Sequence, residues 1–171
     1  AGAHGQIAPS STVYVAHGSN RTFTVTADPH YHVADVVVDG VSTGAVGEYT
    51  FRNVTTGHTI HASFALDRHT LDIASAHGTA DPAAGVYTND YGSVLTNSVS
   101  SPDSHGATQY VCRGWAMTGN EPARGSTNVM VMTHTNDAAL TWQWATNYWL
   151  DTEAGAGGSV VPADAWYAAG E

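Results

Sequence analysis

The chain has 171 residues, and its 15 acidic residues against 5 basic ones give a formal net charge of −10 when the 10 histidines are neutral. A chain this acidic offers no basic surface to neutralise nucleic-acid phosphates, and no apolar run approaches the ~20 residues that a membrane-spanning helix needs. We therefore expect no nucleic-acid partner and no membrane insertion, and any export signal lies outside this sequence.

The first part of the chain predicts short strands joined by tight turns. Frequent Gly, Thr and Val, with few Leu or Met, favour strands over helices. Phe23 and Val25 alternate with threonines, which gives the strand at 21–26 one apolar and one polar face. Asp39-Gly40 is a strong signal for a two-residue hairpin. Further strands are expected at 12–15, 32–38, 48–52 and 59–66.

The second part continues the pattern, so the predicted fold class is all-β. Trp142 and Trp144 share one face of a predicted strand and are expected to anchor the core. The same alternation puts Cys112 on the face opposite Trp115. As the single cysteine, Cys112 is either a small half-buried or buried residue or the site of an intermolecular disulfide. Strands are expected at 71–73, 93–99, 109–115, 128–133 and 139–144.

A short passage near the start of the chain returns twice. Its glycine, proline and tyrosine recur at one offset, Gly5, Pro9 and Tyr14 as Gly78, Pro82 and Tyr87. It opens a third time at 154–171. Self-similarity at a long period is typical of tandem arrays. We therefore expect a first β-rich repeat module at 1–66, a second and longer one at 67–147, and the opening hairpin of an incomplete third at 148–171.

One stretch of the first module resembles a known family. Residues 18–65 read GSNRTFTVTADPHYHVADVVVDGVSTGAVGEYTFRNVTTGHTIHASFA. The order of the aromatic strand, the Val-Asp-Gly turn and the Tyr-Thr-Phe segment is similar to the divergent internalin-type B repeats of bacteria. The second module matches them more loosely, through 110–115 and 140–144. The resemblance implies small β-rich modules, related to β-grasp-like folds with little helix, strung in tandem in secreted or surface-anchored proteins.

The same resemblance bears on turns and on catalysis. The chain has His4 and His30 where the family has glycine, which puts a left-handed turn at these two positions in doubt, although a non-glycine residue can adopt it at modest cost. The family carries no established catalytic residues, so the resemblance argues against an enzyme. We expect no cofactor.

Histidines offer one candidate metal site. His30 and His32 lie two residues apart, so an extended backbone would place both side chains on one face, as chelation by a strand requires. No cysteine or histidine motif supplies a third and a fourth ligand. The alternative is a pair of exposed turn histidines.

Aromatic residues near the end of the chain are the interaction candidates: Trp149, Trp166 and Tyr167, with Cys112 as a fourth. A hairpin at 148–171 would leave unpaired edges unless the second module, a neighbouring repeat or a second copy covered it head to tail. We therefore expect a structural repeat segment, namely a spacer, stalk or filament-building unit of an extracellular or cell-surface bacterial protein. The alternatives are an adhesin or carbohydrate-binding module that meets a glycan or surface protein, and a histidine-based metal-binding module.

Overall fold

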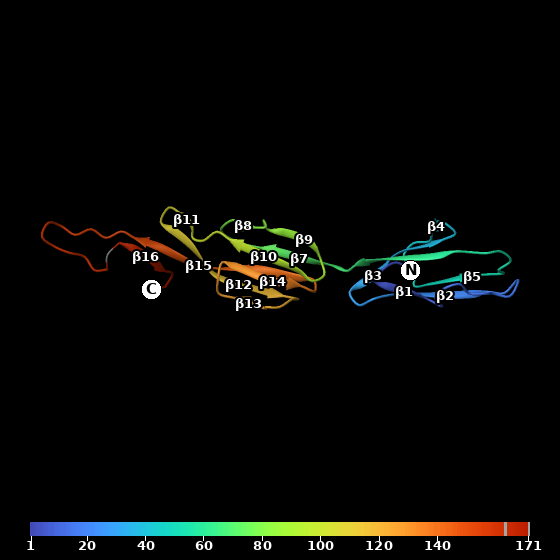
Figure 1. Ribbon diagram of the computed structural model, residues 1–171. Coiled ribbons are helices and arrows are strands. Elements are labelled where there is room, and N and C mark those ends of the chain that lie inside the picture. The colour runs from blue at the N-terminus through green and yellow to red at the C-terminus, as the bar shows by residue number, and fades with distance from the viewer. Residues whose placement is uncertain (163, 171) are drawn as a thin grey trace. The chain divides into compact units, whose positions relative to one another are not determined.

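The computed structural model describes residues 1–162 and 164–170, and every regular element in them is a strand (Figure 1). The all-β prediction is confirmed for these residues. They contain no helix of the length and hydropathy that would cross a membrane. The chain folds as two compact units, Ala1–Asp67 and Arg68–Glu171, with Ala163 and Glu171 outside the described residues.

Unit 1, Ala1–Asp67, consists of two three-stranded sheets with the orders β1-β2-β5 and β4-β3-β6. Strand alternation turns one face of each sheet inward, so the two inner faces form a core of Ile7, Val25, Val36, Val38, Phe51 and Ala62. The strands are β1 (Gly5–Ala8), β2 (Arg21–Ala27), β3 (Tyr31–Val38), β4 (Val41–Ser42), β5 (Glu48–Phe51) and β6 (Ile60–Leu66).

Unit 2, which begins at Arg68, pairs a three-stranded sheet, β14-β10-β8, with a larger sheet of order β11-β12-β15-β7-β9. β13 and β16 pair with β12 and β15. Its strands are β7 (Arg68–Ala74), β8 (Ala80–Asp81), β9 (Gly85–Asp90), β10 (Ser93–Val99), β11 (Asp103–His105), β12 (Thr108–Thr118), β13 (Arg124–Gly125), β14 (Val129–His134), β15 (Ala138–Leu150) and β16 (Ala165–Ala168). Trp142 is 2% exposed and Trp144 packs against the same cluster, as predicted.

Six strands of unit 2 repeat the plan of unit 1. The order β1-β2-β5 matches β8-β10-β14, and β4-β3-β6 matches β13-β12-β15. A bulge interrupts β3 between Val33 and Asp35, and another interrupts β12 between Cys112 and Gly114. Each bulge begins at the same distance after a tyrosine of its strand, so the two units share register as well as order.

The returning passage takes the same position in both units. His4 stacks on Tyr31 with ring centroids 4.1 Å apart, and His77 stacks on Tyr110 at 3.4 Å. The glycines that follow, Gly5 and Gly78, lie against the rings of Phe64 and Trp144. The predicted correspondence of Gly5 with Gly78 is therefore matched by the same contacts.

The correspondence fails at the tyrosines of the passage. Tyr87 lies in β9 and its hydroxyl donates to the carbonyl of Ala83 at 2.8 Å. Tyr14 is 96% exposed, and the strand predicted at 12–15 is absent. The physical reason is pairing, because β9 is held by β7 and the described part of unit 1 contains no strand in that role.

The third return adds to unit 2. β15 runs without a break through the boundary expected between residues 147 and 148, and β16 pairs with its last residues, 147–150. β16 and the end of β15 thus extend the larger sheet of unit 2. That residues 154–171 repeat the earlier passages stays a prediction. The last residue of this segment, Glu171, lies outside the described residues.

Left-handed backbone occurs at the predicted Asp39-Gly40 turn and at two histidines. Asp39 and Gly40 have φ of 49° and 83° and join β3 to β4, which confirms the two-residue hairpin. His4 and His30 adopt φ of 70° and 67°, so both histidines take the left-handed backbone that the missing glycines had put in doubt. For His4, the stack on Tyr31 compensates for the unfavourable conformation.

Candidate functional site

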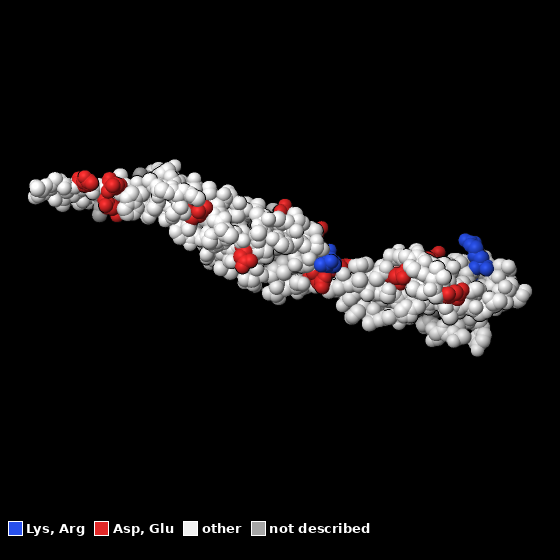
Figure 2. All heavy atoms as spheres, turned by 90° about the horizontal axis from the view of Figure 1, so that it is seen from above, with Lys and Arg blue, Asp and Glu red and all other residues white. Residues whose placement is uncertain are grey.

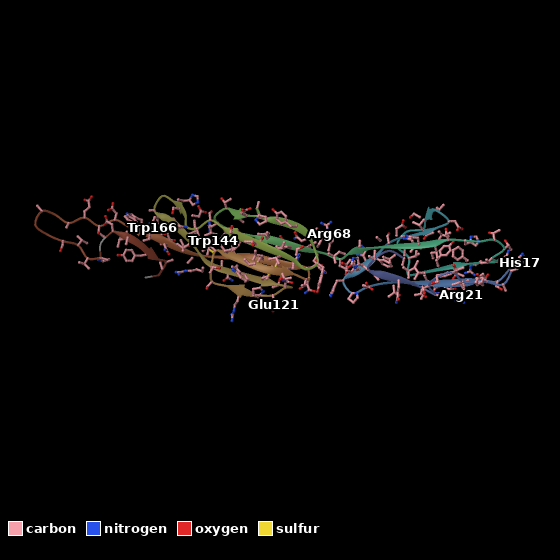
Figure 3. All side chains as sticks on the ribbon, in the orientation of Figure 1. His17, Arg21, Arg68, Glu121, Trp144 and Trp166 are labelled. Carbon is pink, nitrogen blue, oxygen red and sulfur yellow. The ribbon has the colours of Figure 1, made fainter. Side chains whose placement is uncertain are left out.

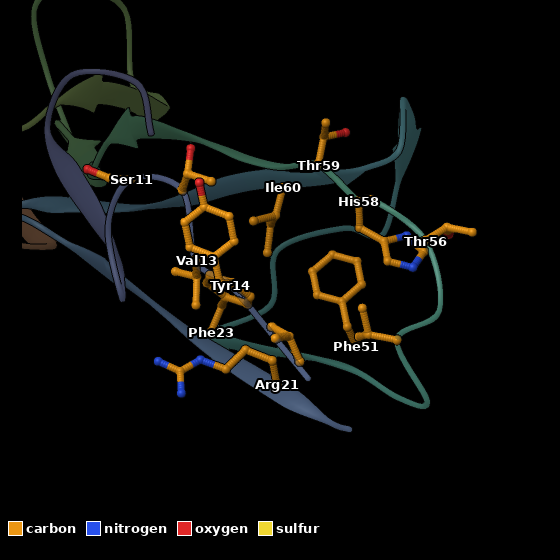
Figure 4. Close-up of a pocket in the computed structure, with 14 residues that line it drawn as sticks. Ser11, Val13, Tyr14, Arg21, Phe23, Phe51, Thr56, His58, Thr59 and Ile60 are labelled. Atoms are coloured by element: carbon orange, nitrogen blue, oxygen red, sulfur yellow. The ribbon is translucent and has the colours of Figure 1, made fainter. Parts of the chain in front are cut away.

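A groove of about 460 Å³ opens in unit 1 beside β6. Figure 4 shows the side chains of Tyr14, Phe23, Phe51 and Ile60 around it, with Arg21 and His58 at its margin. We call it the β6 groove; its lining is Ser11, Thr12, Val13, Tyr14, Val15, Arg21, Phe23, Phe51, Val54, Thr56, Gly57, His58, Thr59 and Ile60.

The β6 groove is apolar at its base and has one arginine, Arg21, at its margin. Phe23 and Phe51 meet edge to face with centroids 5.8 Å apart, and His58 stacks on Phe51 at 4.9 Å. Arg21 is one of the five basic residues of the chain, and no lining residue is acidic. The groove thus suits a ligand that presents apolar surface together with negative charge.

Asp39 fixes the far wall of the groove from outside. Its Oδ1 accepts from the backbone N–H of Thr59 at 2.7 Å, and its Oδ2 lies 2.7 Å from Nδ1 of His58. The backbone hydrogen bond from Thr59, followed by that from His58, lowers the pKa of the Asp39 carboxyl. Asp39 therefore orients His58 and pins the segment that leads into β6.

β6 has an edge that no strand of the described residues covers. In the part of unit 1 that the structure describes, β6 pairs only with β3, although Gly2 donates to the carbonyl of Ala62 at 2.9 Å. In unit 2 the corresponding strand, β15, also pairs in parallel with β7. The β6 groove lies along this uncovered edge, since Thr59 and Ile60 belong to its lining.

The C-terminal hairpin carries three of the predicted interaction residues. Trp149 lies opposite Trp166 with ring centroids 5.5 Å apart, and Tyr167 lies opposite Tyr148. Figure 3 shows Trp166 on this hairpin and Trp144 within the body of unit 2. Tyr148, Trp149 and Leu150 are 53%, 41% and 43% exposed, so the hairpin presents an apolar surface to solvent.

The loop of the hairpin is closed by Asp164. Its Oδ1 accepts from the hydroxyl and from the backbone N–H of Thr152, both at 2.7 Å. These two hydrogen bonds, the one from the hydroxyl first, lower the pKa of the Asp164 carboxyl. Thr152 and Asp164 therefore tie the two arms together beyond the last strand pair.

Cys112 does not lie where alternation predicted. It is half-buried and packs against the same core cluster as Trp115. The bulge between Cys112 and Gly114 inserts one residue, which returns both side chains to the inner face. The expectation of opposite faces is wrong for this reason, and the half-buried environment agrees with the packing interpretation.

His30 and His32 are separated by the start of a strand. His30 lies in the turn before β3, and His32 in β3 places its Nδ1 2.9 Å from Oδ1 of Asp67. Among residues 1–162 and 164–170, no three His, Cys, Asp or Glu side chains gather closely enough to hold a metal ion. The described residues thus place no third ligand beside this histidine pair.

Sequence reasoning missed the β6 groove. The returning passage aligns residues 12–15 with β9, and β9 pairs with β7, whereas the described part of unit 1 has no strand in the place of β7. A strand pattern without a partner strand indicates a place where a strand can be added.

Charge is spread thinly over each unit. On the face seen in Figure 2, acidic side chains stand apart from one another or in small groups, with few basic ones among them. Basic side chains are scarce enough that Arg21 at the β6 groove is a distinctive feature of unit 1, which has one other, Arg52.

Comparison of the chain with protein-family models, with curated proteins and with solved structures finds no match.

Proposed function

We propose that the chain is a non-enzymatic structural repeat segment of an extracellular or cell-surface bacterial protein, where it acts as a spacer, stalk or filament-building unit. The observation that carries this proposal is the repetition of one six-strand plan in two consecutive units. Tandem repeats lengthen a protein by adding units of the same construction. The resemblance of residues 18–65 to internalin-type B repeats supports the bacterial surface as the location.

Each unit supports its own fold. Unit 1 packs around Val36 and Ala62, both fully buried, and unit 2 around Leu71 and Leu140. Only Asp67 separates β6 from β7, so little slack chain lies between the two. Two separate cores on a short connection suit a segment that holds length under load.

Stretching a single chain between its two ends tests this proposal. We expect two unfolding steps, which release about 22–24 nm for the 67 residues of unit 1 and about 34–37 nm for the 104 of unit 2, before the folded lengths are subtracted. One step for the whole chain, or extension without resistance, would contradict the role of a load-bearing spacer.

A carbohydrate-binding or adhesive role is the second candidate. Tyr148 and Trp149 expose about half of their surface on adjacent positions of β15, and flat rings of this kind stack on sugar faces. A glycan array separates the two functions. Binding that is lost in Trp149→Ala favours the adhesive role, and an array without a signal rejects it.

A further inference from the structure

We propose that the β6 groove binds an extended segment of a partner protein, which joins unit 1 as a strand parallel to β6. The strand would carry apolar side chains at alternate positions, as β7 does in unit 2. Main-chain pairing would supply the affinity, and the side chains of the groove the selectivity. This interaction goes beyond the proposed function, since a spacer requires no such site.

The place of the groove in unit 1 can be matched to a place in unit 2. The bulge of β3 begins opposite Phe64 of β6, and the bulge of β12 begins opposite Trp144 of β15. Counting four residues back from each, Ile60 takes the place of Leu140. Ile60 is also one of the residues that line the groove. The strand that lies beside Leu140 in unit 2 therefore indicates what the groove can hold.

β7 is the strand that lies there in unit 2. It pairs in parallel with β15, with Leu71 beside Ala138 and Ile73 beside Leu140. Leu71 and Ile73 are 1% and 2% exposed and belong to the core of unit 2. The corresponding place in unit 1 runs along residues 58–60, where the described residues supply no strand.

Another part of the groove lining, residues 11–15, matches the second neighbour of β7. The returning passage aligns Tyr14 with Tyr87 of β9. β9 pairs antiparallel with β7, with Tyr87 opposite Leu71. A strand in the groove would therefore place the residue at the position of Leu71 between Tyr14 and His58, which both line the groove (Figure 4). The two parts of the lining thus agree on the register of the added strand.

The base of the groove suits an apolar side chain two residues further along this strand. The residue at the position of Ile73 would stand between Thr12 and Ile60. Phe51 belongs to the core of unit 1, and Val54 and Ile60 pack against that core. All three line the groove. An apolar residue there would therefore extend the core of unit 1, as Ile73 extends that of unit 2.

Both sides of the groove are prepared for pairing. Tyr14 is 96% exposed, and among the described residues no backbone hydrogen bond involves residues 12–15. Their N–H and C=O groups are therefore open to a strand in the groove. Asp39 fixes the other side, because it accepts from the N–H of Thr59 and lies 2.7 Å from Nδ1 of His58.

The strands of this kind within the chain are already paired on both edges, which commits the site to a partner protein. β7 lies between β15 and β9. At the end of β15, Tyr148 takes the position of Leu71, because Tyr148 lies opposite Tyr167 as Leu71 lies opposite Tyr87. Tyr148 also pairs with Thr108 of β12. The described residues of a second copy thus offer no free strand with the pattern of β7.

Charge favours a partner strand that is acidic rather than basic. The lining holds Arg21 and His58 and no acidic residue. A peptide of residues 70–76, Thr-Leu-Asp-Ile-Ala-Ser-Ala, has the apolar pair of β7, one acidic residue and no basic residue. With blocked ends, this peptide is the probe for the groove.

Nuclear magnetic resonance of the full chain titrated with the peptide tests the proposal. We expect saturable shifts of the amides of residues 12–15 and 56–60, with a dissociation constant below about 1 mM. Hydrogen exchange of the amides of residues 12–15 should slow by at least about tenfold, because they become paired. The amides of unit 2 should not respond, since β7 already occupies the corresponding place there.

Two controls make the result specific. A peptide with Leu71→Asp and Ile73→Asp keeps its length and should bind at least about tenfold more weakly, because charges would enter the apolar base. Adjacent residues of a strand direct their N–H groups to opposite edges, so only one of Val13→Pro and Tyr14→Pro removes a donor that faces the peptide. That variant should bind the peptide at least about tenfold more weakly than the other, and circular dichroism will show that both are folded.

The outcomes separate the inference from the proposed function. The absence of saturable binding overturns the inference, as do equal affinities of the two peptides or shifts outside the groove lining. A chain that self-associates in sedimentation velocity and thereby protects the amides of residues 12–15 would make a second copy the occupant and overturn the partner protein. The stretching experiment uses the chain alone, so two unfolding steps without peptide binding would reject only the inference.

Discussion

Gly78 lies against the indole of Trp144, so closely that a Cβ on Gly78 would stand 2.7 Å from Cη2 of the ring and would also meet the backbone carbonyl of Ser100. Gly78 also has φ of 66°, where side chains are rarely tolerated. The counterpart in unit 1 is Gly5 against Phe64. A glycine thus lies at the same place in both units, against the ring of an aromatic residue of β6 or β15.

Replacing Gly78 by alanine should therefore destabilise unit 2 beyond the cost of its backbone conformation. Gly92 is the matched control, since its φ is 80° and nothing lies within 4 Å of the place that a Cβ would take. We expect Gly92→Ala to cost about 1 kcal/mol and Gly78→Ala about 1–3 kcal/mol more, for overpacking. Equal unfolding free energies in denaturant titrations of the two variants would show that the contact relaxes without cost.

Much of the fold could be predicted from the sequence, because most strands carry the alternation that a half-buried sheet imposes. β2 with Phe23 and Val25 is one case, and the Asp39-Gly40 turn is another, since its residue types match a backbone with positive φ. These features depend on neighbours in sequence. Local pattern is sufficient for them.

Other features depend on partners that local pattern does not contain. The bulge at Cys112 changes which face follows it, and alternation cannot locate an inserted residue. Residues 12–15 have a strand pattern but no strand, because a strand requires a neighbour to pair with. The β6 groove arises because the described part of unit 1 has no strand in the place that β7 takes in unit 2. It can therefore be recognised only when the two folded units are compared.

Asp39 makes the stability of unit 1 depend on pH in the acidic range. Its pKa is lowered in the folded state, chiefly by the hydrogen bond from the backbone of Thr59, so the carboxylate stabilises the fold above the unfolded pKa of about 3.9. This contribution is lost as the pH falls through the lower folded value. We expect Asp39→Asn to lower the thermal midpoint at pH 6, and the difference from the wild type to shrink below about pH 4.

The exposed Glu48 of the same unit provides the control for this titration. Glu48→Gln should change the free energy of unfolding at pH 6 by no more than about 0.5 kcal/mol. Its thermal midpoint should therefore stay close to that of the wild type. A difference between wild type and Asp39→Asn that stays constant from pH 6 to pH 2 would show that the folded state does not favour the ionised carboxyl.

His134 is a buried polar residue whose removal should stabilise unit 2. Its side chain is fully buried, and neither ring nitrogen has a hydrogen-bond partner among the described residues. A buried polar group without a partner costs about 1–3 kcal/mol. We therefore expect His134→Leu to raise the free energy of unfolding by about that amount, with exposed His17→Leu as a control that changes it little. A loss of stability in His134→Leu would show that the ring is paired in solution.

The two tryptophans of the C-terminal hairpin should hold β16 in place. Trp149 and Trp166 are directly opposite in register and meet edge to face, a geometry worth about 0.5–1.5 kcal/mol beyond the area it buries. Trp149→Ala should therefore speed hydrogen exchange of the β16 amides by about 2–10-fold, since each 1.4 kcal/mol is a factor of ten. Val86→Ala, at an exposed position of β9, should leave that exchange unchanged. Identical exchange in the wild type and Trp149→Ala would mean that backbone pairing and the Thr152–Asp164 hydrogen bonds hold the hairpin without the rings.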